Sequence, residues 1–228
     1  MAPRSYGQYC GITTAVELVA ERWALLIIRD LLVGPRRYTD LKQGLPKIPT
    51  NILSARLKEL QEAGVIGRVP LKSCGLVYEL TEYGRELEPI VMALGRWGFR
   101  SLDDPGDDDI VTSDSLTMAL RTAFRPEATS ASLDFQVRMD GVELRAQVGE
   151  GELKVVQIAP LMPPVGGSLP SGEPQLQFAA DFRFRHLIGG TLTAAAAADQ
   201  GVVTIEKGSV RLLGRFTKIF RIEAPGKG

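Results

Sequence analysis

The chain has 228 residues, of which 44% are hydrophobic and 24% charged, and its formal net charge is +0. This composition is that of an ordinary globular protein and excludes a disordered or collagen-like chain. Two cysteines, Cys10 and Cys74, are too few for a disulfide framework, and no apolar run reaches the roughly 18–20 residues that span a bilayer. We therefore expect a cytoplasmic protein without a membrane partner.

The first part of the chain has the periodicity of three helices. Apolar residues at helical spacing predict a helix over residues 12–34, which the pair Gly34-Pro35 ends. A short helix is expected at 38–44 and a third helix at 50–63. The third helix carries an apolar stripe of Leu53, Leu57 and Leu60.

A predicted β-hairpin follows these helices. Residues 65–69 and 76–80 are rich in strand-forming side chains and flank a polar turn. A further helix is expected at 81–102. Its apolar face comprises Leu87, Ile90, Val91, Leu94 and Trp97.

Three helices followed by a hairpin are typical of a winged helix-turn-helix domain that binds double-stranded DNA. The outer face of the third helix is small and polar, so it can enter the major groove, which is about 12 Å wide. Cations flank this helix and can hold phosphates. The residues that we predict to bind DNA are Arg36, Arg37, Lys47, Thr50, Asn51, Ser54, Ala55, Arg56, Lys58, Arg68 and Lys72.

The zero net charge hides an uneven distribution. Residues 1–102 hold 14 Lys and Arg against 10 Asp and Glu, whereas residues 103–109 hold five Asp. The remaining residues hold 13 cations against 12 anions. The sequence thus predicts a basic domain at 1–102, an acidic linker at 103–112 and a second domain at 113–228.

The N-terminal motifs resemble the HxlR-type winged-helix regulators. That family pairs a cysteine near the first helix with a Trp before "LLIL", then "GxxRFxxL", "LxxRLxxLxxxGL" and "YxLTxxGxxL". The chain departs from the pattern at Pro49 and in the wing, where a Pro-Pro pair is absent. Matching positions are Cys10, Trp23, Gly34, Arg37, Tyr38, Leu41, Leu53, Arg56, Leu57, Leu60, Gly64, Tyr78, Leu80, Thr81, Gly84 and Leu87.

The resemblance implies a homodimer whose interface is built from the first and last helices of this domain. It also implies that the cysteine at position 10 can sense oxidants or electrophiles. Because Cys10 directly precedes a helix, its thiolate is a possible redox site.

The second half has the pattern of an α+β domain. Strands are expected at 132–138, 142–148 and 152–158, and residues 176–182 form either a strand or a strand that enters a helix. The run 194–198 predicts a helix by its alanine content. After the strand at 202–206, an amphipathic helix closes the chain. Its inward side chains are expected to be Val210, Leu213, Phe216, Ile219 and Phe220.

This order resembles the sterol carrier protein-like domains, whose α/β sandwich encloses an apolar tunnel. The resemblance implies a small apolar ligand, with the connection 160–174 as a portal, a lid or a plain surface loop. The residues predicted to line the tunnel are Phe124, Phe135, Leu161, Met162, Phe178, Phe182, Phe184, Phe216 and Phe220.

Enzymatic motifs are missing from the sequence. It contains no GxSxG, P-loop or HExxH pattern, and one histidine, His186, with two distant cysteines gives no zinc site. We therefore predict no catalysis, no metal and no cofactor. The expected function is a dimeric DNA-binding transcription regulator, a repressor by preference, that responds to an apolar effector. The alternatives are a carrier of hydrophobic small molecules and a redox-sensing regulator that acts through Cys10.

Overall fold

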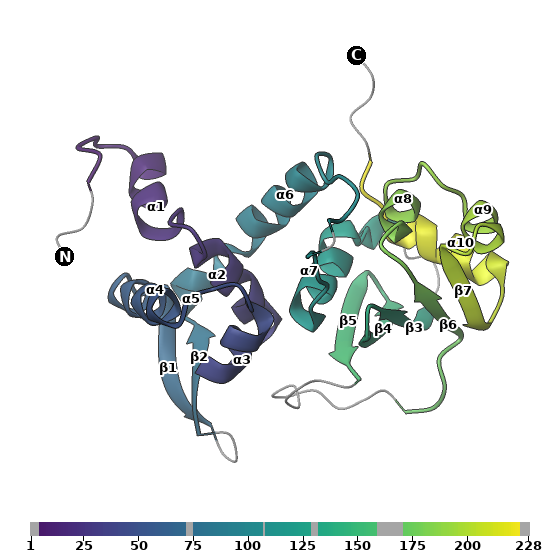
Figure 1. Ribbon diagram of the computed structural model, residues 1–228, viewed down its shortest axis with the longest axis horizontal. Coiled ribbons are helices and arrows are strands. Elements are labelled where there is room, and N and C mark those ends of the chain that lie inside the picture. The colour runs from purple at the N-terminus through teal and green to yellow at the C-terminus, as the bar shows by residue number, and fades with distance from the viewer. Residues whose placement is uncertain (1–4, 72–74, 107, 129–131, 159–170, 224–228) are drawn as a thin grey trace. The chain divides into compact units, whose positions relative to one another are not determined.

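The computed structural model describes residues 5–71, 75–106, 108–128, 132–158 and 171–223. It divides into two compact units, Met1–Val91 and Met92–Gly228. Figure 1 shows the helices and strands of both. The boundary lies earlier than the predicted domain end at residue 102.

Contacts of residues 92–104 explain the earlier boundary. Thr122 Oγ1 donates a hydrogen bond to Met92 Sδ at 3.6 Å. Further along, the Arg185 guanidinium donates to the Leu102 carbonyl at 2.8 Å and forms an ion pair with Asp104 at 2.7 Å. The start of the predicted acidic linker is thus held by the C-terminal unit.

The N-terminal unit contains the predicted helices and hairpin. β1 and β2 pair antiparallel, with Ile66 opposite Leu80 and Leu71 opposite Gly75. A buried core lies between the helices and this hairpin. The elements are α1 (Gly11–Val19), α2 (Ala24–Val33), α3 (Tyr38–Gly44), α4 (Thr50–Glu62), β1 (Ile66–Leu71), β2 (Gly75–Leu80), α5 (Glu82–Arg85) and α6 (Glu88–Phe99), which continues into the next unit.

Two helices that we expected to be continuous are each divided, so those two predictions are wrong. Residues 12–34 form α1 and α2, and between them Trp23 adopts a left-handed conformation with φ of 82°. The region 81–102 forms α5 and α6 because Pro89 has no backbone N–H to donate to the preceding turn.

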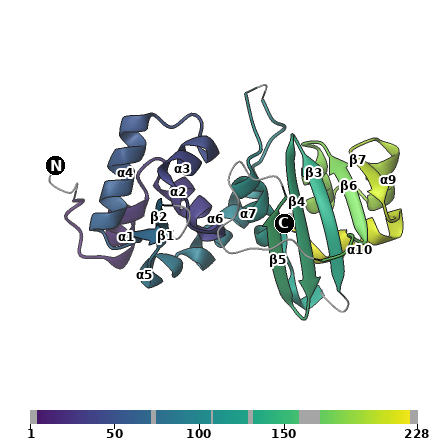
Figure 2. The ribbon, with the colours of Figure 1, turned by 90° about the horizontal axis from the view of Figure 1, so that it is seen from below.

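The C-terminal unit has helices and one sheet, so the predicted mixed α+β class is confirmed. Its five strands have the order β5-β4-β3-β6-β7 (Figure 2). β3 pairs parallel with β6, and the other neighbours are antiparallel. The elements are α7 (Ser113–Ala123), the 3-10 helix η1 (Pro126–Ala128), β3 (Leu133–Met139), β4 (Val142–Gly149), β5 (Glu152–Gln157), β6 (Leu176–Ala180), α8 (Phe184–Ile188), α9 (Ala194–Asp199), β7 (Val203–Lys207) and α10 (Val210–Ile219).

Buried and more exposed side chains alternate along the strands, so one face of this sheet lies against the core. On β3, Leu133, Phe135 and Val137 are fully buried, whereas the residues between them are partly or fully exposed. Residues 176–180 form strand β6, and after a short turn the chain enters helix α8 at Phe184, so the alternative of a strand that leads into a helix describes this region.

Helix α7 was absent from the sequence prediction. Two features could have predicted this helix. A capping box forms at its start, where the Thr112 hydroxyl accepts a hydrogen bond from Ser115 N, and the buried residues Leu116 and Leu120 follow at helical spacing.

Helix α10 is amphipathic as expected, with one exception. Leu213, Phe216 and Ile219 are buried, but Val210 is 41% exposed. Val210 is the first residue of the helix, directly after its N-cap Ser209, and so lies at the end of the buried stripe rather than within it.

Candidate nucleic-acid interface and cavities

The buried leucines of α4 determine which of its side chains face outward. Leu53, Leu57 and Leu60 are at most 1% exposed and anchor the helix in the N-terminal core. Side chains away from this stripe therefore point outward. Thr50, Asn51, Ser54 and Lys58 are exposed, and Ala55 is partly buried.

The beginning of α4 presents backbone N–H groups. Its N-cap is Pro49, which makes no side-chain hydrogen bond, and the first turn has no acidic residue. The Tyr38 hydroxyl donates to the Thr50 carbonyl at 3.0 Å and lies 3.2 Å from Ser54 Oγ. Tyr38 thus fixes α3 against α4, a role that we did not predict. This helix end is suited to hold a phosphate.

Two of the predicted phosphate-binding cations, Lys47 and Arg68, are exposed, as is Lys58 on the outer face of α4. Lys47 is exposed in the connection before α4, and Arg68 is exposed on β1 with its guanidinium 5.7 Å from the Tyr78 ring centroid. Lys58 lies 3.7 Å from Glu62 in a highly exposed pair, which contributes little to stability. Arg37 is partly buried at the start of α3, where its backbone N–H donates to Asp40.

Arg36 and Arg56 do not fit the role that we predicted for them. Arg36 is 8% exposed, forms a β-bridge with Tyr78, and donates from Nη1 to the Pro35 carbonyl. The Arg56 side chain is 18% exposed and pairs with Glu21 and Glu59. Arg36 is buried and Arg56 is engaged by two glutamates, so we leave both out of the proposed DNA contacts. Lys72 lies outside the described residues.

Cys10 is exposed immediately before α1. Backbone hydrogen bonds from Thr13 and Ile12, at the start of the helix, lower the pKa of its thiol. The group therefore has more thiolate at neutral pH than an ordinary cysteine.

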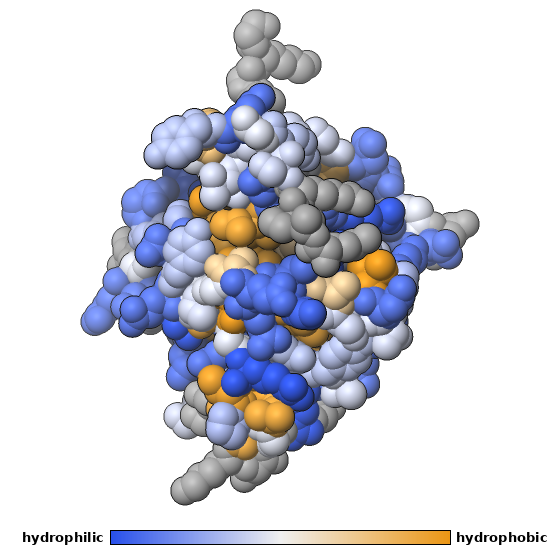
Figure 3. All heavy atoms as spheres, turned by 90° about the vertical axis from the view of Figure 1, so that its left-hand side faces the viewer, coloured by the Kyte–Doolittle hydropathy of each residue, from blue (hydrophilic) through white to orange (hydrophobic). Residues whose placement is uncertain are grey.

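Helices α1 and α6 both expose apolar side chains. None of the described residues of either helix is buried. Figure 3 shows the side of the molecule with the N-terminal helices, where apolar side chains reach the surface among polar ones. The large exposed ones on these two helices are Ile12, Val16, Ile90, Leu94 and Trp97.

The aromatic residues that we predicted to line a tunnel instead pack against one another. Phe216 is fully buried, and its ring centroid lies 4.6 Å from that of Phe220 and 5.0 Å from that of Phe135. Phe178 and Phe184 complete this cluster at 5.4 and 5.7 Å from Phe216. The tunnel prediction fails for these residues because their own rings fill the space.

Two further predicted lining residues are not fully buried. The Phe124 ring is tilted by 42° to that of Phe220, with the centroids 5.9 Å apart, and Phe182 is partly exposed. Leu161 and Met162, with most of the predicted portal, lie outside the described residues.

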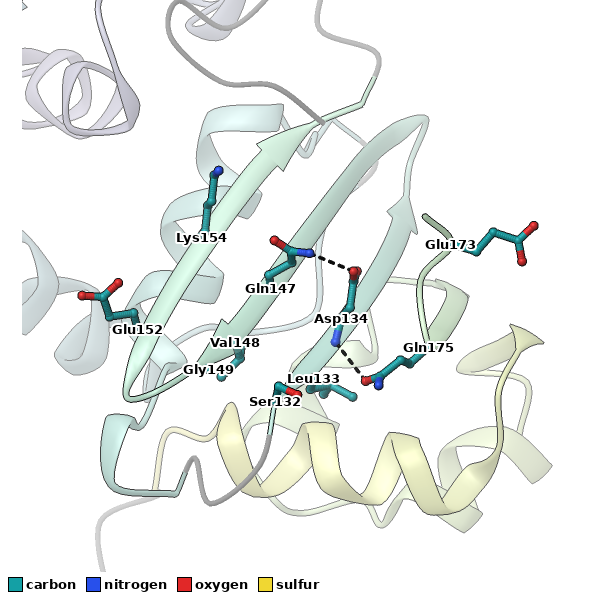
Figure 4. A pocket seen from close by; sticks show the side chains of 10 residues that line it. All are labelled: Ser132, Leu133, Asp134, Gln147, Val148, Gly149, Glu152, Lys154, Glu173 and Gln175. Atoms are coloured by element: carbon teal, nitrogen blue, oxygen red, sulfur yellow. Dashed lines mark hydrogen bonds between the residues drawn. The ribbon is translucent and has the colours of Figure 1, made fainter. Parts of the chain in front are cut away.

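Two cavities of the C-terminal unit have linings that combine charged or polar residues with apolar ones. The first, of about 460 Å³, lies at the edge of β3, β4 and β5 (Figure 4). Beside it, Arg145 donates two hydrogen bonds of 2.9 Å to the two carboxylate oxygens of Asp134, which also accepts from Gln147. The second, of about 510 Å³, is lined by residues near α9 and α10. The two cavities share no lining residue with the phenylalanine cluster.

None of the helices in the described ranges is both long and apolar enough to cross a membrane.

Comparison with known proteins yields a family match in the N-terminal part. Residues 18–105 match the family described as HxlR-like helix-turn-helix. YvaP of Bacillus subtilis, an uncharacterized HTH-type transcriptional regulator, is 35% identical over 91 residues, which cover 39% of this chain and 84% of that protein. A regulator of the same description from Mycobacterium tuberculosis is 44% identical over 93 residues. The match covers 40% of this chain but only 58% of the mycobacterial protein.

Solved structures with similarity to this chain include two regulators. The redox regulator HypR in its oxidized form is 28% identical, with a TM-score of 0.39, and the match covers 42% of this chain and 100% of that one. Quinone-bound YodB from B. subtilis is 32% identical, with a TM-score of 0.35, over 39% of this chain and 96% of that one. The family match ends at residue 105, so nearly all of the C-terminal unit lies outside it.

Proposed function

This chain belongs to the HxlR-like helix-turn-helix family, and on that premise we propose that it is a sequence-specific, DNA-binding transcription regulator. The observation that carries the proposal is the outward face of α4. Asn51, Ser54 and Lys58 are exposed there, and the helix begins without a side-chain cap. This helix is proposed to lie in the major groove of double-stranded DNA, with Arg68 and Lys47 on phosphates.

The regulator is proposed to act as a homodimer. The support is the exposed apolar surface of α1 and α6, which a monomer would leave in water. Two copies related by a twofold axis would present two α4 helices to half-sites about 34–36 Å apart. Repression by occupation of the promoter is the preferred mode of action.

Substitutions on α4 and on the wing are expected to weaken DNA binding in different ways. Asn51→Ala and Lys58→Ala remove side chains that face base edges, so each should cost about 1–3 kcal/mol at defined base pairs and little elsewhere. Arg68→Ala removes a phosphate contact, so binding to every sequence should weaken and the slope of log K against log salt should fall by about 0.9. Fluorescence anisotropy with labelled duplexes over a salt series measures both effects.

Arg211→Ala is the matched control, because Arg211 is an exposed cation of the C-terminal unit. It should leave DNA affinity and salt dependence unchanged. Equal losses for Arg68→Ala and Arg211→Ala would mean that net charge alone, and not this surface, determines binding.

The C-terminal unit is proposed to be an effector-binding unit of the sterol carrier protein-like type. Its five-stranded sheet, with an amphipathic helix at the end, supports this relationship. The phenylalanine cluster removes the support for a tunnel at the predicted position. The class of effector is therefore inferred from the two cavities that charged residues help to line.

Redox sensing through Cys10 is a second candidate, favoured by the exposed thiol and its lowered pKa. The rate of alkylation by iodoacetamide, followed against pH, should give a midpoint for Cys10 below the ordinary cysteine value because the thiolate reacts. Oxidation by diamide should weaken DNA binding of the native chain and not of Cys10→Ser. An equal loss in both proteins would assign any redox effect to Cys74 and refute this role of Cys10.

A further inference from the structure

The larger of the two cavities in the C-terminal unit lies where three separate segments meet. Residues 125–128 follow α7, residues 190–194 connect α8 to α9, and residues 214–221 form the second half of α10 and its end. The cavity has a volume of about 510 Å³, within the range of about 300–1,000 Å³ that is usual for small-molecule sites.

The charges in this cavity have one sign. Its lining includes Arg125, Lys218 and Arg221 and no acidic residue. Arg125 is already paired, at 3.0 Å from Glu127 and 3.4 Å from Glu223. Within the described residues, the Lys218 ammonium and the Arg221 guanidinium have no hydrogen-bond or ion-pair partner in the protein. Two uncompensated cations thus face one hollow.

A glycine makes room for one of these cations. A Cβ atom at Gly190 would lie 2.0 Å from one guanidinium nitrogen of Arg221 and 2.4 Å from the other. Gly190 also has φ of +73°, a conformation that other residues rarely adopt. The Arg221 guanidinium can lie flat over this backbone only because the position has no side chain.

The rest of the wall consists of small or apolar residues and two threonines. Beside the cations it is lined by Ala128, Gly190, Leu192, Thr193, Ala194, Gly214 and Thr217. Cations in a hollow with low-dielectric walls attract anions more strongly than the same cations on an open surface. A planar guanidinium also matches the geometry of a carboxylate or phosphate with two parallel hydrogen bonds.

We propose that this cavity binds a small organic anion, with its carboxylate or phosphate group held by Lys218 and Arg221 and a compact apolar body against Leu192 and Ala194. In its role as an effector site the inference rests on the proposed regulatory function. Anion binding itself is a property of the C-terminal unit and can be measured without DNA.

The test is isothermal titration calorimetry of the full chain, without DNA, with three probes of similar size. Benzoate carries a carboxylate, phenyl phosphate carries a phosphate, and benzyl alcohol is the neutral analogue. At least one of the two anions should bind saturably with one site per chain, and benzyl alcohol should bind at least about tenfold more weakly. The anion that binds more tightly identifies the acidic group of the natural ligand.

Variants locate the site. Lys218→Gln and Arg221→Gln should each weaken binding of the preferred anion by about tenfold or more, since each loses a charge-assisted contact. Arg211→Gln, an exposed cation on the same helix, should leave binding unchanged. Lys218 is exposed, so its variant should fold as the native chain does even where Arg221→Gln does not, and circular dichroism checks both.

Failure of both anions to bind would overturn the proposal, as would equal binding of the neutral probe or unchanged anion binding by Lys218→Gln. Anion binding without any effect on DNA affinity would keep the site and reject its role as an effector site. If anion binding and DNA binding are coupled, DNA should change the affinity for the anion by the same factor by which the anion changes the affinity for DNA. If the chain binds the anion but no DNA, the proposed regulatory function is refuted and the proposed anion site is retained.

Discussion

Replacing Phe216 by alanine is expected to lower the free energy of unfolding of the C-terminal unit by about 3–5 kcal/mol. Phe216 is fully buried, and its ring lies within 5.7 Å of the rings of Phe135, Phe178, Phe184 and Phe220, measured between centroids. Truncation removes the centre of this cluster and leaves a cavity that the surrounding rings cannot fill without leaving their rotamers. Urea unfolding followed by circular dichroism measures the loss.

Phe182→Ala is the control for this prediction. Phe182 belongs to the same unit but is partly exposed, so its truncation should cost less than half as much. A cost below about 1 kcal/mol for Phe216→Ala would contradict a solid aromatic core, because a side chain at the wall of an open tunnel leaves little new empty volume when it is shortened.

Replacing Asp134 by asparagine is expected to cost about 3 kcal/mol at neutral pH, the lower end of the range for breaking a buried ion pair. The Arg145 side chain is 8% exposed and would lose its counter-charge, although its Nη1 would still donate to the Gly172 carbonyl at 2.8 Å. Asp134 retains 19% exposure, which is why the lower end applies. Glu173→Gln, in a highly exposed pair with Lys207, should cost less than about 1 kcal/mol.

The effect of Asp134→Asn should depend on pH in a defined direction. Burial raises the pKa of Asp134, but hydrogen bonds donated by Arg145 and Gln147 outweigh it, so the pKa lies below its usual value of 3.8. A carboxylate with a lowered pKa stabilises the folded state fully above its unfolded pKa, and this stabilisation is lost as the pH falls through the folded pKa. The difference between native chain and variant should therefore shrink below about pH 3.8. A difference that stays constant from pH 7 to pH 3 would show that Asp134 is not the stabilising charge.

The N-terminal fold could be predicted because local patterns agree with it. The stripe of Leu53, Leu57 and Leu60 sets both the helix and its inward face, and all three are buried as expected. The break in the predicted helix 12–34 could not be predicted in this way, since it depends on one tryptophan in a left-handed conformation that its side chain does not favour.

The charged and aromatic site residues were harder to predict for a related reason. The sequence does not show whether an arginine is exposed and can bind a phosphate or, like Arg36, is buried against the hairpin. Likewise, Phe135 and Phe216 suit a tunnel wall and a packed core equally well in sequence, and only their ring-to-ring distances distinguish the two. The cationic cavity could not be predicted from the sequence because Arg125, Gly190 and Arg221 lie far apart in the chain and meet only in the fold.

The central claim, specific DNA recognition by a dimer through α4, is tested most directly by selecting binding sites from random duplexes with the full-length chain at low salt. The account predicts an enriched site with two inverted half-sites whose centres lie about 10–10.5 base pairs apart, and a changed base preference within each half-site for Asn51→Ala. A selection that enriches no site, or one in which Asn51→Ala selects the same site with the same preference, would contradict it.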